Sequence, residues 1–309
     1  MKKTLLAAAI ICFSLSAFAQ DELLNLMNEG NSKQKKDFAI ATFKTTRLFN
    51  FHTIETQSKK TLDFRISHRF SDMTLKDPST LGQTAFGLDG AASIKLSLEY
   101  CFDGRFQLGI ARCNDQKMLS GFAKYRLLRQ TSTKGNPVSI TLFSGVYHSF
   151  VQTGDDYFSK ALDRLSFCHQ ILIARKINRR FSLQVGGVMV HYNVVPFASD
   201  KNDQFFATVV TRFKLTNRMA ITAEFATAPT NDATIVAPGV ATPHAPYAPG
   251  PYFPSMSVGM DIETGGHVFQ IGICNSYGLD EPEYFAHTNK DWKQTQIRIG
   301  FNISRVFDL

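Results

Sequence analysis

The sequence predicts an all-β membrane protein, a transmembrane antiparallel up-and-down β-barrel of about 12 strands. Polarity alternates residue by residue through twelve segments, as expected of strands with one apolar and one polar face. The connections between these segments are alternately long and tight, which is the loop arrangement of bacterial outer-membrane barrels. An even number of strands places both chain termini on the periplasmic side.

The first residues predict a secretory signal peptide, residues 1–19. Lys2 and Lys3 form its basic start, Leu5–Phe18 is apolar, and Ala17-Phe18-Ala19 fits the small-residue cleavage pattern. We expect cleavage after Ala19 and export to the bacterial outer membrane. No other apolar run reaches the ~18 residues that a transmembrane helix requires.

Residues 20–60 are expected to form a periplasmic N-terminal segment that precedes a barrel domain at 61–309. Gln20–Lys36 is polar and is interpreted as a tail or a short amphipathic turn. Phe38–Lys60 carries mixed signals, and within it Leu48–Glu55 can be read as a strand. The segment either adds a hairpin to the barrel or lies inside it as a plug.

Twelve strands are expected from the period-2 alternation. Most are long enough for a tilted membrane crossing of about 9–11 residues. They are Thr61–Phe70, Ala91–Phe102, Phe106–Asn114, Leu119–Gln130, Val138–Phe150, Leu162–Lys176, Arg180–Val195, Asp203–Lys214, Arg218–Ala228, Ser255–Thr264, His267–Leu279 and Thr295–Phe307.

The connections sort by length into two sets, one at each end of the strands. The longer loops are Ser71–Gly90, Asp115–Met118, Val151–Ala161, Pro196–Asn202, Pro229–Pro254 and Asp280–Gln294. The tight turns are Asp103–Arg105, Thr131–Pro137, Ile177–Arg179, Leu215–Asn217 and Gly265–Gly266. Pro229–Pro254 is proline-rich and is expected to be an exposed loop, a lid or a partner-binding segment.

Gly265-Gly266 is a strong signal for a two-residue hairpin turn, because such turns need positive φ. Folding the chain there pairs Ile262 with Phe269 and Asp261 with Gln270. Three-residue turns at 103–105 and 177–179 keep polar residues opposite polar ones. They pair Tyr100 with Leu108, Leu98 with Ile110, and Ile173 with Leu183.

One strand face is apolar and the other holds nearly all the charges. The apolar face includes Leu62, Phe64, Ile66, Ile94, Leu96, Leu98, Val138, Ile140, Leu142, Ile171, Ile173, Leu183, Val185, Ile221, Phe225, Ile297, Ile299 and Phe301. A 12-stranded barrel is too wide to fill with these side chains, so we expect them to face lipid. The charges expected in the lumen are Asp63, Arg65, Arg69, Lys95, Glu99, Lys124, Arg126, Arg212, Glu224, Asp261, Glu263 and Arg298.

No motif for a metal, a cofactor or an enzymatic reaction occurs. HExxH, CxxC, GxGxxG and GxSxG are all absent, so no cofactor, no metal and no catalytic residue is assigned. Asp261 and Glu263 are interpreted as a lumen charge ladder, with Arg298 as a neighbour. Ser144 with His148 or His169 on the lipid side is the one arrangement that favours a hydrolase, and it has no defined third group.

Four blocks resemble a family of outer-membrane β-barrel proteins common in Bacteroidetes. They are Ala41–Leu48, Leu62–Phe70, Asp261–Gln270 and Gly300–Phe307, joined by shorter matches at Leu127–Gln130 and Leu172–Lys176. The resemblance implies a barrel and its location, but no activity or catalytic residue.

The function expected is a passive channel or binding protein for small polar solutes, with the lumen charges setting its selectivity. The alternatives are an outer-membrane lipid hydrolase and a plugged structural or assembly barrel. The expected partners are outer-membrane lipid, small polar solutes and the barrel-assembly machinery. The last is suggested by the alternating Phe301, Ile303 and Phe307 at the C-terminus. A nucleic-acid partner is not expected of an exported chain.

Overall fold

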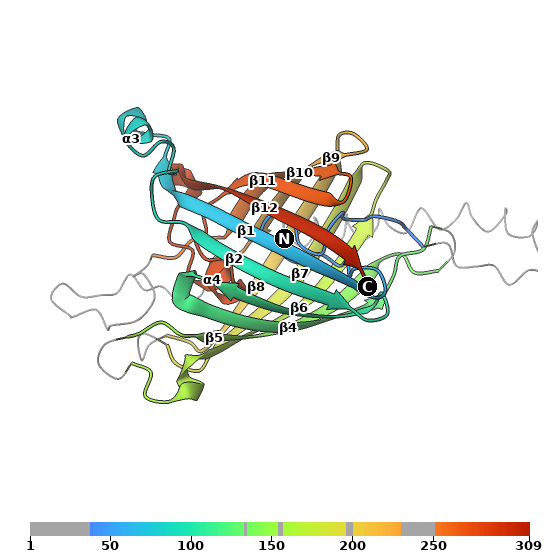
Figure 1. Ribbon diagram of the computed structural model, residues 1–309, viewed down its shortest axis with the longest axis horizontal. Coiled ribbons are helices and arrows are strands. Elements are labelled where there is room, and N and C mark those ends of the chain that lie inside the picture. The colour runs from blue at the N-terminus through green and yellow to red at the C-terminus, as the bar shows by residue number, and fades with distance from the viewer. Residues whose placement is uncertain (1–37, 133–134, 154–156, 196–199, 230–250) are drawn as a thin grey trace, which may run out of the picture. The chain divides into compact units, whose positions relative to one another are not determined.

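The computed structural model describes residues 38–132, 135–153, 157–195, 200–229 and 251–309. The predicted signal peptide, the tail at 20–36 and most of the proline-rich loop lie outside these residues. Twelve antiparallel strands close into a barrel in which every strand pairs with its sequence neighbours and β1 pairs with β12. This confirms the predicted fold class and strand number (Figure 1).

All twelve predicted strands are present, with ends shifted by a few residues. They are β1 (Thr61–Thr74), β2 (Ser93–Cys101), β3 (Phe106–Cys113), β4 (Met118–Leu128), β5 (Ser139–Ser149), β6 (Leu165–Lys176), β7 (Phe181–Tyr192), β8 (Asp203–Lys214), β9 (Met219–Ala226), β10 (Met256–Thr264), β11 (His267–Cys274) and β12 (Gln296–Asp308). The largest difference is in β11, which ends at Cys274, five residues before the predicted Leu279. β1 continues four residues past the predicted Phe70, through an irregularity in its pairing with β12.

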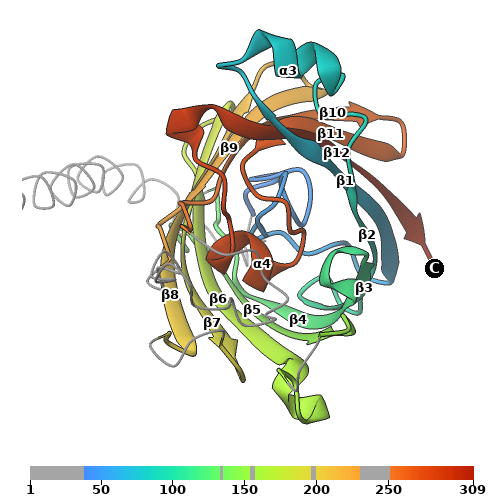
Figure 2. The ribbon, with the colours of Figure 1, turned by 90° about the vertical axis from the view of Figure 1, so that its left-hand side faces the viewer.

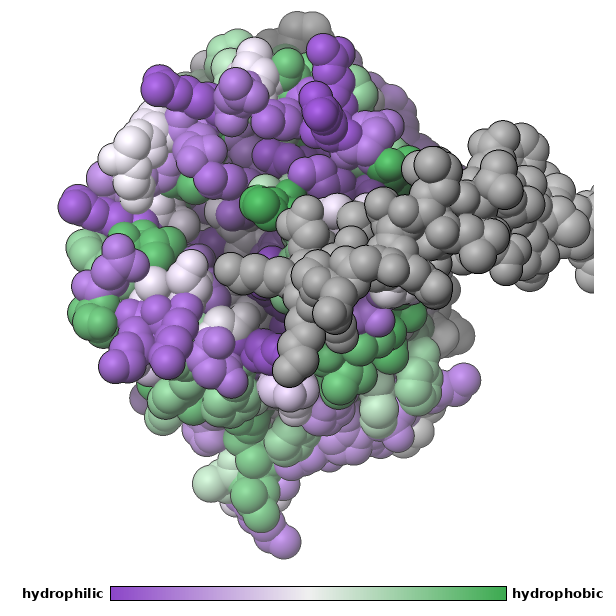
Figure 3. Space-filling view, turned by 90° about the vertical axis from the view of Figure 1, so that its right-hand side faces the viewer, coloured by the Kyte–Doolittle hydropathy of each residue, from purple (hydrophilic) through white to green (hydrophobic). Residues whose placement is uncertain are grey.

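Two ends of the barrel are distinguished by their connections. The tight-turn end holds the turns after β2, β4, β6, β8 and β10, together with the start of β1 and the end of β12. The long-loop end holds the remaining connections, including the short helix α3 (Pro78–Gln83). In Figure 1 the C-terminus marks the tight-turn end and α3 marks the long-loop end. Figure 3 shows that hydrophilic residues cover much of the tight-turn end.

The predicted register holds at two hairpins. The Gly265-Gly266 turn pairs Ile262 with Phe269 and Asp261 with Gln270, and Gly266 has φ of 116°. Tyr100 pairs with Leu108 and Leu98 with Ile110, as the three-residue turn at Asp103–Arg105 requires. In that turn the Asp103 carboxylate accepts hydrogen bonds from the N–H groups of Arg105 and Phe106.

The predicted pairing of Ile173 with Leu183 is wrong. Ile173 pairs with Val185, and Leu183 pairs with Arg175, so the register is shifted by two residues. The turn still has three residues, but it lies at Asn178–Arg180, one residue later than predicted, and the Asn178 side chain accepts hydrogen bonds from the N–H groups of Arg180 and Phe181. A shift of two leaves every side chain on the same face, so alternation alone could not detect it.

The apolar strand face points outward. Ile94, Leu96, Leu98, Leu142, Ile171, Val185, Ile221 and Phe225 are exposed, as expected of side chains that contact lipid. Ile297 differs, because it is only 4% exposed and lies at the long-loop end of β12, where Met73 is its partner in β1. Among the described residues, no helix is long and apolar enough to span a membrane.

The lumen is filled from both ends by segments that are not part of the barrel wall. Residues 38–60 enter and leave at the tight-turn end and contribute no strand, so Leu48–Glu55 is not a barrel strand. The loop between β11 and β12 enters from the long-loop end and carries α4 (Glu281–Ala286). Figure 2, seen from the long-loop end, shows α4 and the blue N-terminal segment inside the ring of strands.

Candidate functional site

Residues 46–53 form a hairpin-like turn whose tip lies deep in the lumen, and we call residues 46–57 the plug segment. Two internal hydrogen bonds close the turn, from Leu48 N–H to the Phe51 carbonyl and from Thr53 N–H to the Thr46 carbonyl. Phe51 stacks on Tyr284 and contacts Phe285, with ring centroids 5.4 and 5.0 Å apart. The plug segment therefore meets α4 through an aromatic contact between the two ends of the barrel.

Glu281 at the start of α4 is the polar centre of this meeting. Its carboxylate accepts hydrogen bonds from Arg47 at 2.7 Å, His52 at 2.9 Å and Tyr147 at 2.8 Å. Lys95 lies 3.6 Å from it and 2.8 Å from the neighbouring Asp280. Glu281 is only 1% exposed, so these partners replace the water that a buried carboxylate requires.

The charge states at this centre follow from burial and neighbours. Burial and the Arg47 guanidinium lower the pKa of His52 to about 3, so His52 is neutral and donates its Nε2–H to Glu281. Burial acts to raise the pKa of Glu281, but Arg47 and Lys95 outweigh it and hold this pKa well below the usual value. The centre is therefore a carboxylate between two cations and a neutral imidazole.

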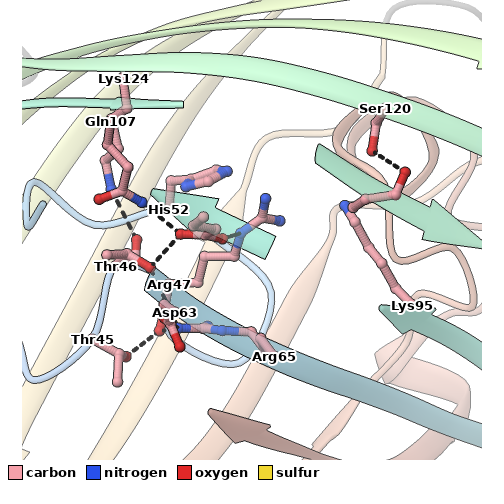
Figure 4. A network of polar contacts seen from close by, with 12 residues as sticks. Thr45, Thr46, Arg47, His52, Asp63, Arg65, Lys95, Gln107, Ser120 and Lys124 are labelled. Carbon is pink, nitrogen blue, oxygen red and sulfur yellow. Dashed lines mark hydrogen bonds and ion pairs between the residues drawn. The ribbon is translucent and has the colours of Figure 1, made fainter. Parts of the chain in front are cut away.

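Figure 4 shows how the plug segment lies against the wall beside this centre. Thr46, Arg47 and His52 face Asp63 and Arg65 on β1, Gln107 on β3 and Lys124 on β4. Arg47 also contacts Glu99 at 3.3 Å, and Thr46 donates a hydrogen bond to the same carboxylate. On another part of the wall Lys95 and Ser120 both bind Asp280 and hold the start of α4.

Phe49 at the tip occupies a glycine recess beside Gly259 and Gly272, and Gly300 next to them makes room for the Arg69 side chain. Gly259, Gly272 and Gly300 are register partners across β10, β11 and β12. A Cβ added at Gly259 or Gly272 would lie 3.5 or 3.2 Å from Phe49. The Arg69 guanidinium lies over the Phe49 ring, 3.7 Å from its centroid. The absent side chains thus make room for an aromatic ring and its cation partner.

The centre of the lumen is closed by these residues. Leu48, Phe51, His52, Glu281 and Tyr284 are at most 2% exposed. A water-filled path would expose such side chains, so no open channel passes them. Beside Arg65 and Lys95 a cavity of about 10 Å³ remains, which is room for about one water molecule.

The charged residues predicted for the lumen have inward positions and partners. Ten of them are at most 6% exposed, namely Asp63, Arg65, Arg69, Lys95, Glu99, Lys124, Arg126, Glu224, Asp261 and Arg298. Arg212 and Glu263 are half-buried, and Glu263 forms an ion pair with Lys44 ahead of the plug segment. The charges are therefore used to hold internal segments as well as to line a wall.

Arg298 is not the partner of the carboxylate pair Asp261 and Glu263. It lies 3.4 Å from Asp72 and stacks on the Tyr277 ring. The nearest cation to Asp261 is Arg212, at 3.6 Å. Arg298 sits at the long-loop end of β12, opposite Asp72, whereas Asp261 lies toward the tight-turn end.

A cluster of acids lies at the long-loop end, around Asp115 in the connection between β3 and β4. Burial raises the pKa of Asp115 to about 7, and the carboxylates of Glu283 and Asp280 add to this shift. Burial also raises the pKa of Asp280. The described residues contain no group of three or more His, Cys, Asp or Glu side chains that could hold a metal ion.

Ser144 and His169 face each other on the lipid side and hydrogen-bond at 3.0 Å. Among the described residues, no carboxylate or amide side chain hydrogen-bonds to His169, so the pair lacks the group that would orient the imidazole. The four cysteines Cys101, Cys113, Cys168 and Cys274 are buried free thiols, and Cys101 and Cys113 lie opposite Gln107 and Lys95.

Residues 43–307 match the model of the family described as "Membrane bound beta barrel domain (DUF5777)". The chain therefore belongs to this family of membrane-bound barrels, and it has the fold of the outer-membrane type. No curated protein matches the chain.

Several solved barrels resemble the structure at low sequence identity. The KdgM porin is 9% identical, with a TM-score of 0.44 over 80% of this chain and 99% of that one. The NanC porin is 6% identical, with a TM-score of 0.48 over 80% of this chain and 100% of that one. An outer membrane channel from Pseudomonas putida F1 is 11% identical, with a TM-score of 0.48 over 82% of this chain and 98% of that one. Likeness at this level adds nothing to the strand pairing and carries no solute over to this chain.

Sequence reasoning missed the residues that close the lumen: Arg47, His52, Tyr147 and Glu281. Tyr147 could have been found, because its strand position shares the inward face with Phe143 and Ser149. The other three lie in segments without alternation. For Arg47 the signal was a block of family resemblance outside any predicted strand, which indicated a role that the barrel wall does not explain.

Proposed function

We propose that the protein is a gated channel of the bacterial outer membrane that passes small polar solutes. The observation that carries this proposal is a charged and polar inner wall whose only obstruction, among the described residues, is two internal segments that meet at Glu281. A wall of this kind suits water once those segments move. The closed arrangement is the resting state of the channel.

The wall charges would set the selectivity of the open channel. Arg65, Lys95 and Lys124 contact the plug segment or the α4 loop in the closed state. Withdrawal of those segments leaves these cations facing water beside Glu99 and Asp63. A solute that carries both hydrogen-bonding and charged groups then finds complementary partners on the wall.

The orientation in the membrane is also a proposal. The sorting of tight turns and long loops supports a periplasmic tight-turn end and periplasmic termini. The proposal includes removal of residues 1–19, and N-terminal sequencing of the mature protein is expected to begin at Gln20. Assembly would use the barrel-assembly machinery, which is supported by the outward aromatic positions at the end of β12.

Single-channel recording in planar bilayers tests the proposal. The folded wild-type protein is expected to conduct in rare, discrete openings, and a Glu281→Gln variant is expected to open more often. If neither protein conducts although both migrate on gels as folded, heat-modifiable barrels, the channel proposal fails. A closed structural barrel would then be the better description.

A further inference from the structure

The wall of the lumen binds the plug segment mainly through the segment's main chain. Every residue from Thr46 to Gln57 except Thr53 has a backbone N–H or C=O hydrogen-bonded to a wall side chain, over distances of 2.6 to 3.4 Å. The wall side chains are Arg65, Arg69, Gln107, Lys124, Arg126, Thr141, Gln184, Glu224, Gln270 and Asn302, from eight different strands.

Two wall residues bind the main chain with paired contacts. The Glu224 carboxylate accepts from the N–H groups of Asn50 and Phe51, at 2.9 Å each, and Ser257 also donates to it. The Gln184 amide donates to the His52 carbonyl and accepts from the Ile54 N–H, both at 2.8 Å. An amide that both donates to and accepts from an extended chain forms the same paired contact that a neighbouring β-strand would form.

Main-chain groups are the same in every peptide, so these contacts do not depend on the sequence of the segment. In peptide recognition, main-chain hydrogen bonds give affinity and side-chain pockets give specificity. The lumen has both parts. The glycine recess with Arg69 takes an aromatic side chain at the tip, and Glu281 takes basic or hydrogen-bonding side chains on either side of it.

We propose that the inner wall is a peptide-binding site, that residues 46–57 are its built-in ligand, and that the solutes of the channel are oligopeptides. The preferred peptide carries an aromatic residue at a turn, flanked by residues that hydrogen-bond to Glu281. Only the statement about solutes rests on the proposed channel function. The binding site stands on the wall contacts themselves.

A purely structural plug would need the same backbone groups satisfied, because buried N–H and C=O groups require partners. A built-in ligand and a structural plug differ in whether the segment can be exchanged for a free peptide. A built-in ligand can be replaced by a free peptide once it is no longer tethered, because the tether supplies a high effective concentration. A structural plug is part of the folded core and cannot be replaced.

The experiment converts the tethered segment into a free one within the folded full chain. A recognition sequence for a specific protease is inserted between Lys59 and Lys60, both of which are exposed, and the protein is cut after folding. The probe is a fluorescent synthetic peptide with the sequence of residues 42–57, and its binding to cut and uncut protein is followed by fluorescence anisotropy.

The cut protein is expected to bind the peptide saturably, and the uncut protein at least about tenfold more weakly, because the tethered segment competes. N-methylation at Asn50 and Phe51 removes the hydrogen bonds to Glu224 and is expected to weaken binding at least about tenfold. N-methylation at Lys44, outside the plug segment, is the matched control and leaves binding unchanged. A peptide that keeps Arg47, Phe49 and His52 in place and has its other side chains shuffled is expected to bind within about tenfold of the original, because the main-chain contacts persist.

Two results would overturn the proposal: no exchange of the resident segment even at large peptide excess, or binding that is unaffected by N-methylation and lost on shuffling. Conductance of the same cut protein separates this proposal from the channel. Peptide binding without any conductance leaves the binding site standing and rejects the channel. Conductance without peptide binding or peptide block supports the channel and rejects the peptide-binding site.

Discussion

Arg47 of the plug segment donates a hydrogen bond to Glu281 of α4 at 2.7 Å, although the two residues are 234 positions apart in the chain. One enters the lumen from the tight-turn end and the other from the long-loop end. Both are almost completely buried, so neither charge can return to water without separating the two segments. The pair therefore couples the plug segment to the loop that carries α4. Displacement of either segment removes a contact that holds the other in the lumen.

Glu281→Gln is expected to open the lumen more often. The substitution keeps the size of the side chain but removes the carboxylate charge that Arg47 and Lys95 share, so that among the described residues Arg47 retains only Glu99 and Lys95 only Asp280 as counter-charge. Leaving a buried charge fully uncompensated costs roughly 3–5 kcal/mol, and the expected cost here is a part of that. Single-channel recording measures the opening frequency. Asp163→Asn is the control, because Asp163 is an exposed carboxylate in a loop that hydrogen-bonds to Ser159. Equal opening frequencies for the two variants would contradict the role given to Glu281.

Phe49→Ala is expected to loosen the tip of the plug segment. Truncating a buried aromatic side chain costs about 3–5 kcal/mol, part of which is the cavity that remains. Faster protease cleavage within residues 46–57 and a higher conductance are the measured effects. Ile40→Ala is the matched control, because Ile40 precedes the plug segment and is 74% exposed. Equal cleavage rates in both variants would show that the glycine recess does not hold the tip.

Acidic pH is expected to stabilise the packing at the long-loop end. The pKa of Asp115 is about 7 in the folded protein, above the ordinary value near 4, so the folded state binds the proton more tightly. Stability therefore falls as pH rises from about 4 to about 7 and stays low above that range. Hydrogen exchange of residues 115–117 and 280–286 at pH 5.5 and 8.5 measures this change when the rates are converted to protection factors, which removes the faster intrinsic exchange at higher pH.

Asp115→Asn serves as the control for that prediction, because the amide does not titrate. The variant is expected to show much weaker pH dependence in the same residues. Glu281 works in the opposite direction, since its pKa is lowered, but it stays ionised at pH 5.5 and adds nothing within this range. Wild-type protection factors that are higher at pH 8.5 than at pH 5.5 would refute the assignment.

Ile171→Arg is expected to destabilise the barrel in a bilayer. Ile171 lies at the middle of β6, faces outward and is 46% exposed, so an arginine there meets the lipid core. The expected cost is about 2–4 kcal/mol, measured by urea unfolding in lipid vesicles. Leu162→Arg, in the loop before β6 and 66% exposed, is expected to be neutral. Equal stability of both variants would place the lipid boundary elsewhere.

The barrel wall could be predicted from the sequence because its period is two and its chemistry is simple. Along each strand apolar side chains that face lipid alternate with polar side chains that face the lumen. The orientation of Ile171 and of Asp261 therefore follows from residue type alone. The alternation shows which face a residue belongs to, but it does not show which residue of the neighbouring strand is its partner. The pairing of Ile173 with Val185 rather than Leu183 depends on a side-chain hydrogen bond within the turn, which leaves no mark on the alternation.

The closure of the lumen could not be predicted in the same way. The backbone of residues 46–57 is bonded mainly by side chains from eight strands, with only a short internal turn of its own, so no local period reveals its path. The partner of Asp261 depends on how strands stagger around the barrel, which brings Arg212 near and leaves Arg298 with Asp72. Glu281 lies in a six-residue helix, too short to give a helical pattern.

Phe38 forms a bridge with Thr131, and the Lys60 carbonyl accepts a hydrogen bond from the Leu309 N–H, so both ends of the inserted segment lie at the same rim. The chain goes in and comes back without passing through. Its removal therefore requires no chain terminus to be drawn along the barrel axis and no pair of strands to separate. In the proposed gated channel, emptying and refilling the lumen is therefore a movement that leaves every strand pair of the barrel intact.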